Sequence, residues 1–154
     1  MILEEIPNFL VLSENVWTGG MPNPEQLADA AQRGVQLVIN LAPHEVLNAL
    51  PNETAIVTSL GMQYINIPVI WTTPTKDGLV RFMDIMDENQ GKKILVHCQA
   101  NFRATAFMAL YRILRQGWNA DGAMEGMHKI WDTEDYPIWK MFIEENLKRS
   151  REGL

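Results

Sequence analysis

The chain lacks any apolar run long enough to cross a bilayer. A membrane-spanning helix needs about 18 or more consecutive apolar residues, and no stretch of the 154 residues reaches that length. The N-terminus, Met1–Glu5, also lacks the basic flank and the long apolar core of a signal peptide. From these absences we expect no membrane partner and a cytoplasmic location.

Cysteine and basic residues are both scarce. A single thiol, Cys98, cannot form an internal disulfide and fits a reducing compartment. The 13 Lys and Arg residues are outnumbered by 19 Asp and Glu, and the resulting net charge of −6 disfavours nucleic acid as a partner. No repeat, low-complexity tract or linker interrupts the chain. We therefore expect one domain over residues 1–154.

The hydrophobic pattern predicts strands that alternate with helices. Strands are expected at 9–12, 16–17, 35–41, 64–69 and 93–97. Cap and breaker residues predict helices that begin at Pro24, Pro51 and Thr75, after the Cys98 loop, at Asn119 and near Pro137. This alternation predicts an α/β fold with a central, mostly parallel sheet of four to five strands and helices on both faces.

The most informative segment is Val96–Thr105, in which Cys98 ends an apolar run and Arg103 follows five positions later. An amphipathic helix begins near the arginine, so the intervening loop lies at a helix N-terminus. Backbone N–H groups of such a loop bind oxyanions, and their positive field favours the thiolate over the thiol. In open α/β sheets, ligands bind outside the carboxyl ends of the strands, where this loop is expected.

The His97-Cys98 pair, the short loop and Arg103 at the start of a helix resemble the cysteine-dependent phosphatases of the tyrosine and dual-specificity group. Segments 16–22, 34–41 and 67–69 resemble the same superfamily, and more closely a bacterial branch of small phosphatase-like domains. The resemblance implies a (phosphotyrosine protein phosphatase)-like fold. It also implies hydrolysis of phosphomonoesters through a phosphocysteine, without a metal or other cofactor.

The resemblance also assigns roles in the loop. Cys98 is expected to be the nucleophile and Arg103 the bidentate clamp on the phosphoryl oxygens. A phosphate or sulfate ion is expected in the loop, and a phosphorylated small molecule or phosphoprotein as the substrate. The backbone of the intervening residues is expected to cradle the anion, namely Gln99, Ala100, Asn101 and Phe102. Supporting roles are expected for His97, Thr105 and Trp71.

Three departures from the family pattern affect the predicted chemistry. Four residues rather than five separate Cys98 from Arg103, and Asn101 takes the place of a loop glycine. Ala104 replaces the hydroxyl residue that usually follows the arginine, and Thr105 is the substitute that we expect. No aspartate follows the 64–69 strand at once, so the candidate general acids are more distant in sequence: Asp77, Glu45 and then Asp132, Glu134 or Asp135.

These departures leave three hypotheses open. The first is a cysteine-dependent phosphatase of low activity. The second is a rhodanese-like sulfurtransferase or persulfide carrier, because a four-residue spacing is typical of that loop. The third is a non-catalytic module that binds phosphate or sulfate, favoured by Ala104 and by the missing acid.

Overall fold

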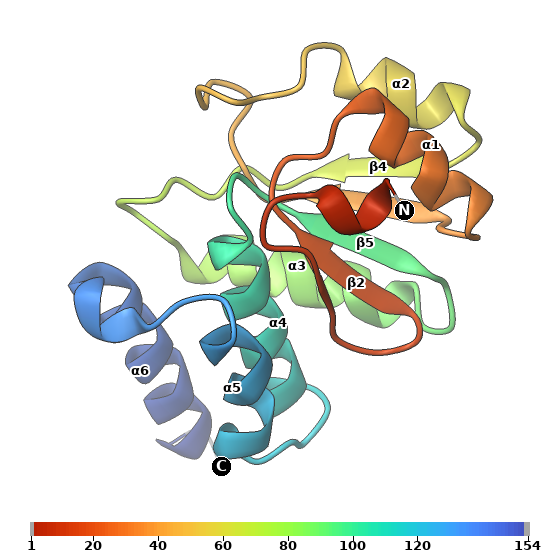
Figure 1. The fold of residues 1–154 in the computed structure, drawn as a ribbon. Coiled ribbons are helices and arrows are strands. Elements are labelled where there is room, and N and C mark those ends of the chain that lie inside the picture. The colour runs from red at the N-terminus through yellow and green to blue at the C-terminus, as the bar shows by residue number, and fades with distance from the viewer. Residues whose placement is uncertain (1, 153–154) are drawn as a thin grey trace.

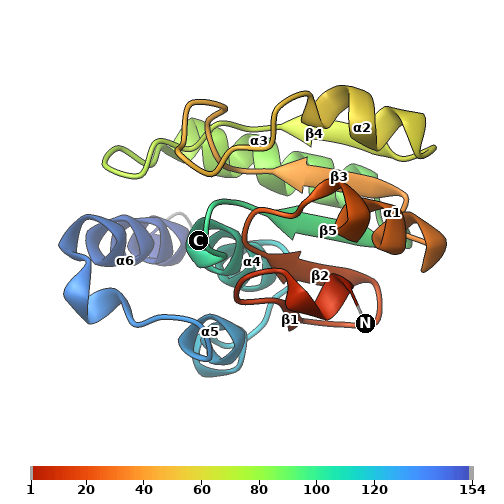
Figure 2. The same ribbon diagram turned by 45° about the horizontal axis from the view of Figure 1, so that its top comes forward.

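The computed structural model describes residues 2–152, and side chains as far as 148, as an α/β sandwich (Figures 1 and 2). Its sheet has five strands in the order β1-β2-β5-β3-β4. The strands are β1 (Leu10–Val11), β2 (Val16–Gly19), β3 (Leu37–Asn40), β4 (Gln63–Asn66) and β5 (Ile94–His97). Strand β1 runs antiparallel to β2, and all other pairs are parallel. The predicted fold class is confirmed.

Helices cover both faces of this sheet. The six α-helices are α1 (Pro24–Gln32), α2 (Glu53–Ser59), α3 (Lys76–Glu88), α4 (Phe102–Leu114), α5 (Ala120–His128) and α6 (Pro137–Glu152), with short 3-10 turns η1 (Leu3–Glu5) and η2 (Thr133–Asp135). Figures 1 and 2 show α1 and α2 on one side of the sheet and α3 and α4 on the other, with α5 and α6 packed outside α4.

Alternation along the strands explains the two layers. Val38 and Leu95 face the smaller core beneath α1 and α2, whereas Ile39 and Val96 face the larger core beneath α3 and α4. Successive strand residues point to opposite faces. Because both faces are covered, β3 and β5 are buried at every position.

The capping residues fix the helix starts close to the predicted positions. Asn23 and Gln26 form a reciprocal capping box at α1, Thr75 accepts from Gly78 N at α3, and Asn119 accepts from Gly122 N at α5. Strands β1 and β3 are shorter than predicted at both ends, β4 covers 63–66 rather than 64–69, and β5 begins one residue late. Strand β2 is longer than predicted, because it pairs with β5 as far as Gly19. None of the described helices is both long and apolar enough to span a membrane.

The register places the carboxyl ends of four strands side by side. Gly19 of β2 pairs with His97 of β5, which pairs with Asn40 of β3, which in turn pairs with Asn66 of β4. The chain then leaves β5 directly into Cys98. The candidate loop therefore lies at the edge of the sheet where ligands bind in this class of fold.

Candidate active site

The carbonyl oxygens of the loop after β5 point outward and are held by neighbouring segments. Gln99 O accepts from Met21 N at 3.3 Å and from Asn48 Nδ2 at 3.2 Å, and Ala100 O accepts from Asn8 Nδ2 at 3.0 Å. By contrast, the backbone N–H groups of residues 99, 100, 102 and 103 have no acceptor among the described residues. Unpaired N–H groups at a helix N-terminus form an anion-binding cradle.

Gly20 allows the N-terminal segment to pack directly on this loop. A Cβ atom at Gly20 would lie 3.0 Å from the carbonyl oxygens of both Gln99 and Pro7, closer than a side-chain carbon normally comes. Gly20 also forms an isolated antiparallel bridge with Ala100. This close contact explains the Gly19-Gly20 pair that follows the predicted second strand.

Asn101 makes the turn from the loop into α4. It adopts a left-handed conformation with φ of +69°, which asparagine tolerates better than most residues. Its Nδ2 donates to Asn8 O at 2.7 Å and to Thr18 Oγ1 at 3.0 Å, while its buried Oδ1 has no hydrogen-bond partner in the part of the chain that the structure describes. Asn101 therefore supplies both the backbone conformation of the family's glycine and two anchoring hydrogen bonds.

Replacing Asn101 by alanine should destabilise the fold more than replacing it by glycine. Both variants lose the two side-chain hydrogen bonds, but only alanine also retains the cost of a left-handed φ, about 1–2 kcal/mol. We expect the free energy of unfolding of Asn101→Ala to lie below that of Asn101→Gly by about 1 kcal/mol, measured by urea denaturation. Equal stabilities would contradict the role given to the positive φ.

Cys98 and Arg103 meet at the centre of the loop. Cys98 is fully buried and the Arg103 residue is 5% exposed. Burial lowers the pKa of Arg103, while the charge of the Cys98 sulfur and a hydrogen bond to it act in the opposite direction. The two expected catalytic groups are therefore neighbours in the loop.

The guanidinium is held in place by the segment that follows β4. Arg103 Nε donates to Val69 O at 2.8 Å, and its guanidinium carbon lies 5.3 Å from the centroid of the Trp71 ring. Trp71 in turn stacks on Trp139 of α6 at 5.1 Å, and Trp139 Nε1 donates to the Trp71 carbonyl. Trp71 thus forms a wall beside Arg103, supported by α6.

A second aromatic contact connects the loop to the segment after α5. Phe102, the first residue of α4, stacks on Trp131 with ring centroids 4.8 Å apart and an interplanar angle of 5°. Trp131 Nε1 also donates to Thr105 Oγ1 at 3.0 Å, and that hydroxyl donates to Asn101 O at 2.7 Å. The Thr105 hydroxyl is therefore engaged by the backbone and by Trp131, and it has no hydrogen bond to Cys98 within the described chain.

His97 connects the loop to a buried carboxylate that the sequence reasoning missed. His97 Nε2 lies 2.5 Å from Glu53 Oε2, and Nδ1 lies 3.4 Å from the carbonyl oxygen of Cys98. Glu53, at the first position of α2, is 4% exposed, and its Oε1 accepts from Asn40 Nδ2 and Tyr64 OH, each at 3.1 Å. His97 therefore positions the backbone at Cys98 rather than contacting the sulfur.

The network around Glu53 is polar and anchored on three strands, and it reaches the exposed His44, whose Nε2 lies 3.3 Å from Tyr64 OH. Burial, followed by the neighbouring Glu53 carboxylate, raises the pKa of Tyr64, so the Tyr64 hydroxyl remains a donor. Asn40 Oδ1 accepts from Ala42 N at 2.9 Å, which fixes the amide orientation. Asn40 could have been noticed because it ends the strand beside Cys98, whereas nothing near Glu53 in the sequence marks it as buried.

Replacing Glu53 by leucine should cost about 3 kcal/mol or more of unfolding free energy, because three buried donors lose their acceptor. Glu53→Gln should cost less. Its amide oxygen still accepts from Asn40 and Tyr64, and His97 can carry its proton on Nδ1 toward the Cys98 carbonyl. Urea denaturation of the two variants checks the ranking, and a leucine variant as stable as the glutamine variant would contradict it.

The structure does not hold the predicted general acids against the loop. Asp77 is exposed in the first turn of α3, and Glu45 is exposed in the connection between β3 and α2. Asp132 caps η2 by accepting from Glu134 N at 3.0 Å. In the described part of the chain, none of these carboxylates has a hydrogen bond or ion pair with Cys98 or Arg103. Asp132 is nevertheless adjacent in sequence to Trp131, which stacks on the loop.

No cluster of His, Cys, Asp and Glu with the composition of a metal site occurs among residues 2–152. The electrostatics of the candidate site come instead from Arg103 and from the backbone amides of residues 99, 100, 102 and 103.

The family comparison agrees with this geometry. Residues 9–136 match the model of a family described as "DSP-PTPase phosphatase fused to NAD+ Kinase". The matched range contains every strand of the sheet, Cys98 and Arg103. The chain therefore belongs to this family of phosphatases, the class that its fold and its cysteine loop define.

Individual relatives extend the comparison. A crystal structure of a candidate phosphatase (DUF442) from Shewanella putrefaciens CN-32 is 37% identical, covers 94% of this chain and 91% of that one, and has a TM-score of 0.85. TpbA of P. aeruginosa, solved in complex with phosphotyrosine, shares the fold with a TM-score of 0.71 at 18% identity, over 88% of this chain and 82% of that one.

A curated relative from Xylella fastidiosa, a beta-lactamase hydrolase-like protein, is 31% identical over 106 residues, which is 67% of this chain. The match covers 24% of that protein, so the chain spans about a quarter of its length.

Proposed function

We propose that this protein hydrolyses phosphomonoesters, with Cys98 as the nucleophile and Arg103 as the phosphoryl clamp. The observation that carries the proposal is a loop that joins the buried Cys98 to the buried Arg103 and whose amides at residues 99, 100, 102 and 103 have no acceptor among the described residues. Such amides and a planar guanidinium match the oxygens of a phosphoryl group. The complex of TpbA with phosphotyrosine supports a phosphorylated substrate.

The reaction has two steps in this proposal. The Cys98 thiolate attacks phosphorus in line, an S–P bond forms, and the P–O bond to the leaving group breaks as the leaving oxygen takes up a proton. Water then attacks the phosphocysteine, the S–P bond breaks, and inorganic phosphate leaves with the thiolate restored. Arg103 and the loop amides stabilise the charge on the equatorial oxygens in both steps, so catalysis depends on positioning and electrostatics.

The rate should depend strongly on the leaving group. A general acid contributes about 10²–10⁴-fold, and neither Asp77 nor Glu45 is held against the loop. We expect nitrophenyl phosphate to turn over much faster than an alkyl phosphate, and Asp77→Asn and Glu45→Gln to retain wild-type kcat on nitrophenyl phosphate. A loss of about 10²-fold in either variant would identify that residue as the acid and contradict this expectation.

Sulfur transfer is the second candidate, favoured by the four residues between Cys98 and Arg103. In that reaction Cys98 attacks the outer sulfur of thiosulfate, sulfite leaves, and cyanide then takes the sulfur as thiocyanate. Thiocyanate formation that is lost in Cys98→Ser, with no nitrophenol release by the wild type, would replace the phosphatase proposal by this one. If neither product forms while phosphate raises the melting temperature, the protein is an anion-binding module.

A further inference from the structure

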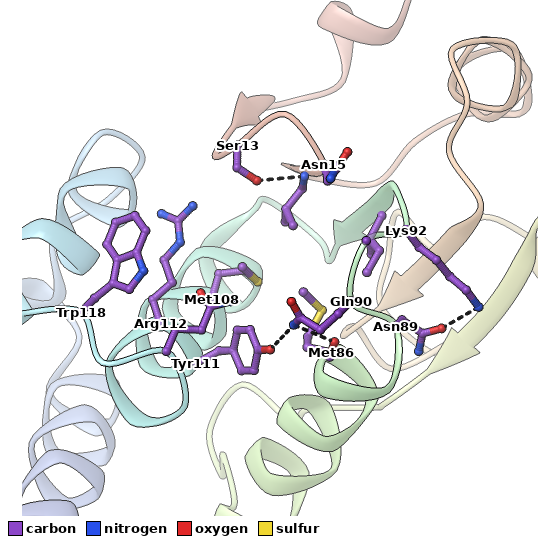
Figure 3. A pocket seen from close by; sticks show the side chains of 14 residues that line it. Ser13, Asn15, Met86, Asn89, Gln90, Lys92, Met108, Tyr111, Arg112 and Trp118 are labelled. Atoms are coloured by element: carbon purple, nitrogen blue, oxygen red, sulfur yellow. Dashed lines mark hydrogen bonds between the residues drawn. The ribbon is translucent and has the colours of Figure 1, made fainter.

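A pocket of about 490 Å³ (Figure 3) lies at the N-terminal ends of strands β2 and β5, whereas Cys98 follows the C-terminal end of β5. Val16 and Ile94, the first residues of β2 and β5, are paired in register and form part of its lining. The turn between β1 and β2 and the C-terminal ends of α3 and α4 provide the remaining walls. The volume falls within the range of about 300–1,000 Å³ that is typical of small-molecule sites.

The lining of this pocket carries positive charge, whereas the chain as a whole is acidic. Arg112 and Lys92 line it, and no Asp or Glu is among the described lining residues. The chain as a whole carries a net charge of −6. Two cations without a carboxylate between them therefore mark a local positive region on an acidic protein, which favours anions over cations as occupants.

Arg112 is buried without a carboxylate partner. The Arg112 residue is 6% exposed, its guanidinium carbon lies 4.2 Å from the centroid of the Trp118 ring, and Nη2 donates to Leu12 O at 3.1 Å. Burial lowers the pKa of Arg112, although an arginine stays charged at neutral pH. Within the described chain no carboxylate pairs with it, in contrast to Arg115, which pairs with Asp84 and Asp87.

The hydrogen bond to Leu12 is the only one that the Arg112 guanidinium makes among the described residues, and it leaves most of the guanidinium fork available. A guanidinium carries several N–H donors in one plane, and the charge of a buried cation costs free energy unless an anion or acceptors compensate it. Figure 3 shows Arg112 and Trp118 side by side at one end of the pocket, so the indole holds the guanidinium in place without neutralising it.

The middle of the pocket offers neutral polar groups. Gln90 Nε2 donates to Tyr111 OH at 2.7 Å and to Met86 O at 3.2 Å, so its Oε1 stays free to accept. Tyr111 OH donates to Asp87 Oδ1 at 2.8 Å, so the Asp87 carboxylate, which is not part of the pocket lining, is already hydrogen-bonded. At the far end, Lys92 Nζ donates to Asn89 Oδ1 at 2.9 Å and to Gln63 Oε1 at 3.4 Å, and Figure 3 shows its side chain extending away from Arg112. A hydrophilic ligand finds partners here, whereas an apolar ligand would leave Arg112 without compensation.

We propose that this pocket binds a small hydrophilic organic anion, distinct from the phosphoryl group bound by the Cys98 loop. A carboxylate or phosphate of the ligand accepts from the Arg112 guanidinium beside Trp118, because the planar fork matches two oxygens of either group. The polar body of the ligand lies along Gln90 and Tyr111 toward Lys92. This site does not depend on the proposed phosphatase activity, since no hydrogen bond or ion pair among the described residues links its lining to the side chains of Cys98 or Arg103.

The test uses the Arg103→Met variant, which removes the clamp of the Cys98 loop, and two probes titrated by calorimetry. Citrate represents carboxylates and ribose 5-phosphate represents phosphate esters. We expect at least one of them to bind saturably at one site. Adding Arg112→Met should weaken that binding by about tenfold or more, whereas Arg115→Met, a matched loss of charge outside the pocket, should leave it unchanged. The probe that binds identifies the oxyanion preferred.

Absence of saturable binding by both probes would overturn the proposal, as would equal affinity in the Arg112→Met and Arg115→Met variants. If Arg112→Met fails to fold, the binding site is located by NMR instead, from the changes in backbone amide shifts when the probe is titrated into the Arg103→Met protein. Shifts at Asn15 and Gly91 and at the Trp118 indole support the site, and shifts confined to residues 98–105 contradict it.

Discussion

Replacing Cys98 by serine should reduce kcat for nitrophenyl phosphate by at least about 10³-fold, because a hydroxyl at neutral pH is a far weaker nucleophile than a thiolate. The change is nearly isosteric, and Cys98 N still donates to Gly19 O in the variant backbone. The fold and the loop amides should therefore persist. Steady-state kinetics of the two proteins, purified in parallel, measure the effect.

Phosphate binding provides the control for this variant. We expect inorganic phosphate to raise the melting temperatures of Cys98→Ser and of the wild type alike, since Arg103 and the amides are present in both. Hydrolysis by the serine variant within about tenfold of the wild-type rate would mean that Cys98 does not attack phosphorus, and the phosphatase proposal would fail.

Replacing Arg103 by lysine should lower kcat/KM by about 10²–10³-fold, the effect of losing transition-state hydrogen bonds to a developing oxyanion. Lysine keeps the positive charge but loses the planar fork. It also loses the Nε bond to Val69 O and the contact with Trp71. Arg115→Lys is the matched control. Arg115 is the C-cap residue of α4, the helix that contains Arg103, and it pairs with Asp84 and Asp87 at the surface.

The Arg115→Lys control should show wild-type kinetics. If Arg103→Lys also retained wild-type kcat/KM, the charge alone would suffice and the bidentate geometry would be irrelevant. A loss confined to KM, with kcat unchanged, would assign Arg103 to ground-state binding rather than to the transition state.

The fold was predictable because local signals agreed with the global arrangement. The box formed by Asn23 and Gln26 predicted the start of α1, and the apolar runs at 35–41 and 93–97 predicted the strands that the structure buries on both faces. The Cys98–Arg103 loop was predictable for the same reason, since a strand end, a short loop and a helix start are adjacent in sequence.

The partners of the supporting residues were not predictable, because they act through contacts that are distant in sequence. Glu53 reaches His97 across 44 positions, and Trp131 reaches Thr105 across 26. Composition and periodicity describe one segment at a time, so they cannot pair a carboxylate on α2 with a histidine on β5. The same limit applies to Thr105. Its hydroxyl was expected to serve Cys98, but it is hydrogen-bonded to the backbone and to Trp131, which is distant in sequence.

Trapping the covalent intermediate tests the central claim most directly. Wild-type protein mixed with excess nitrophenyl phosphate, quenched in acid during turnover and analysed by intact mass and peptide mapping, should carry one phosphoryl group on Cys98. The Cys98→Ser protein treated in the same way should carry none. Turnover of the substrate by wild type with no phosphoryl group on Cys98, or with that group on another residue, would contradict the account.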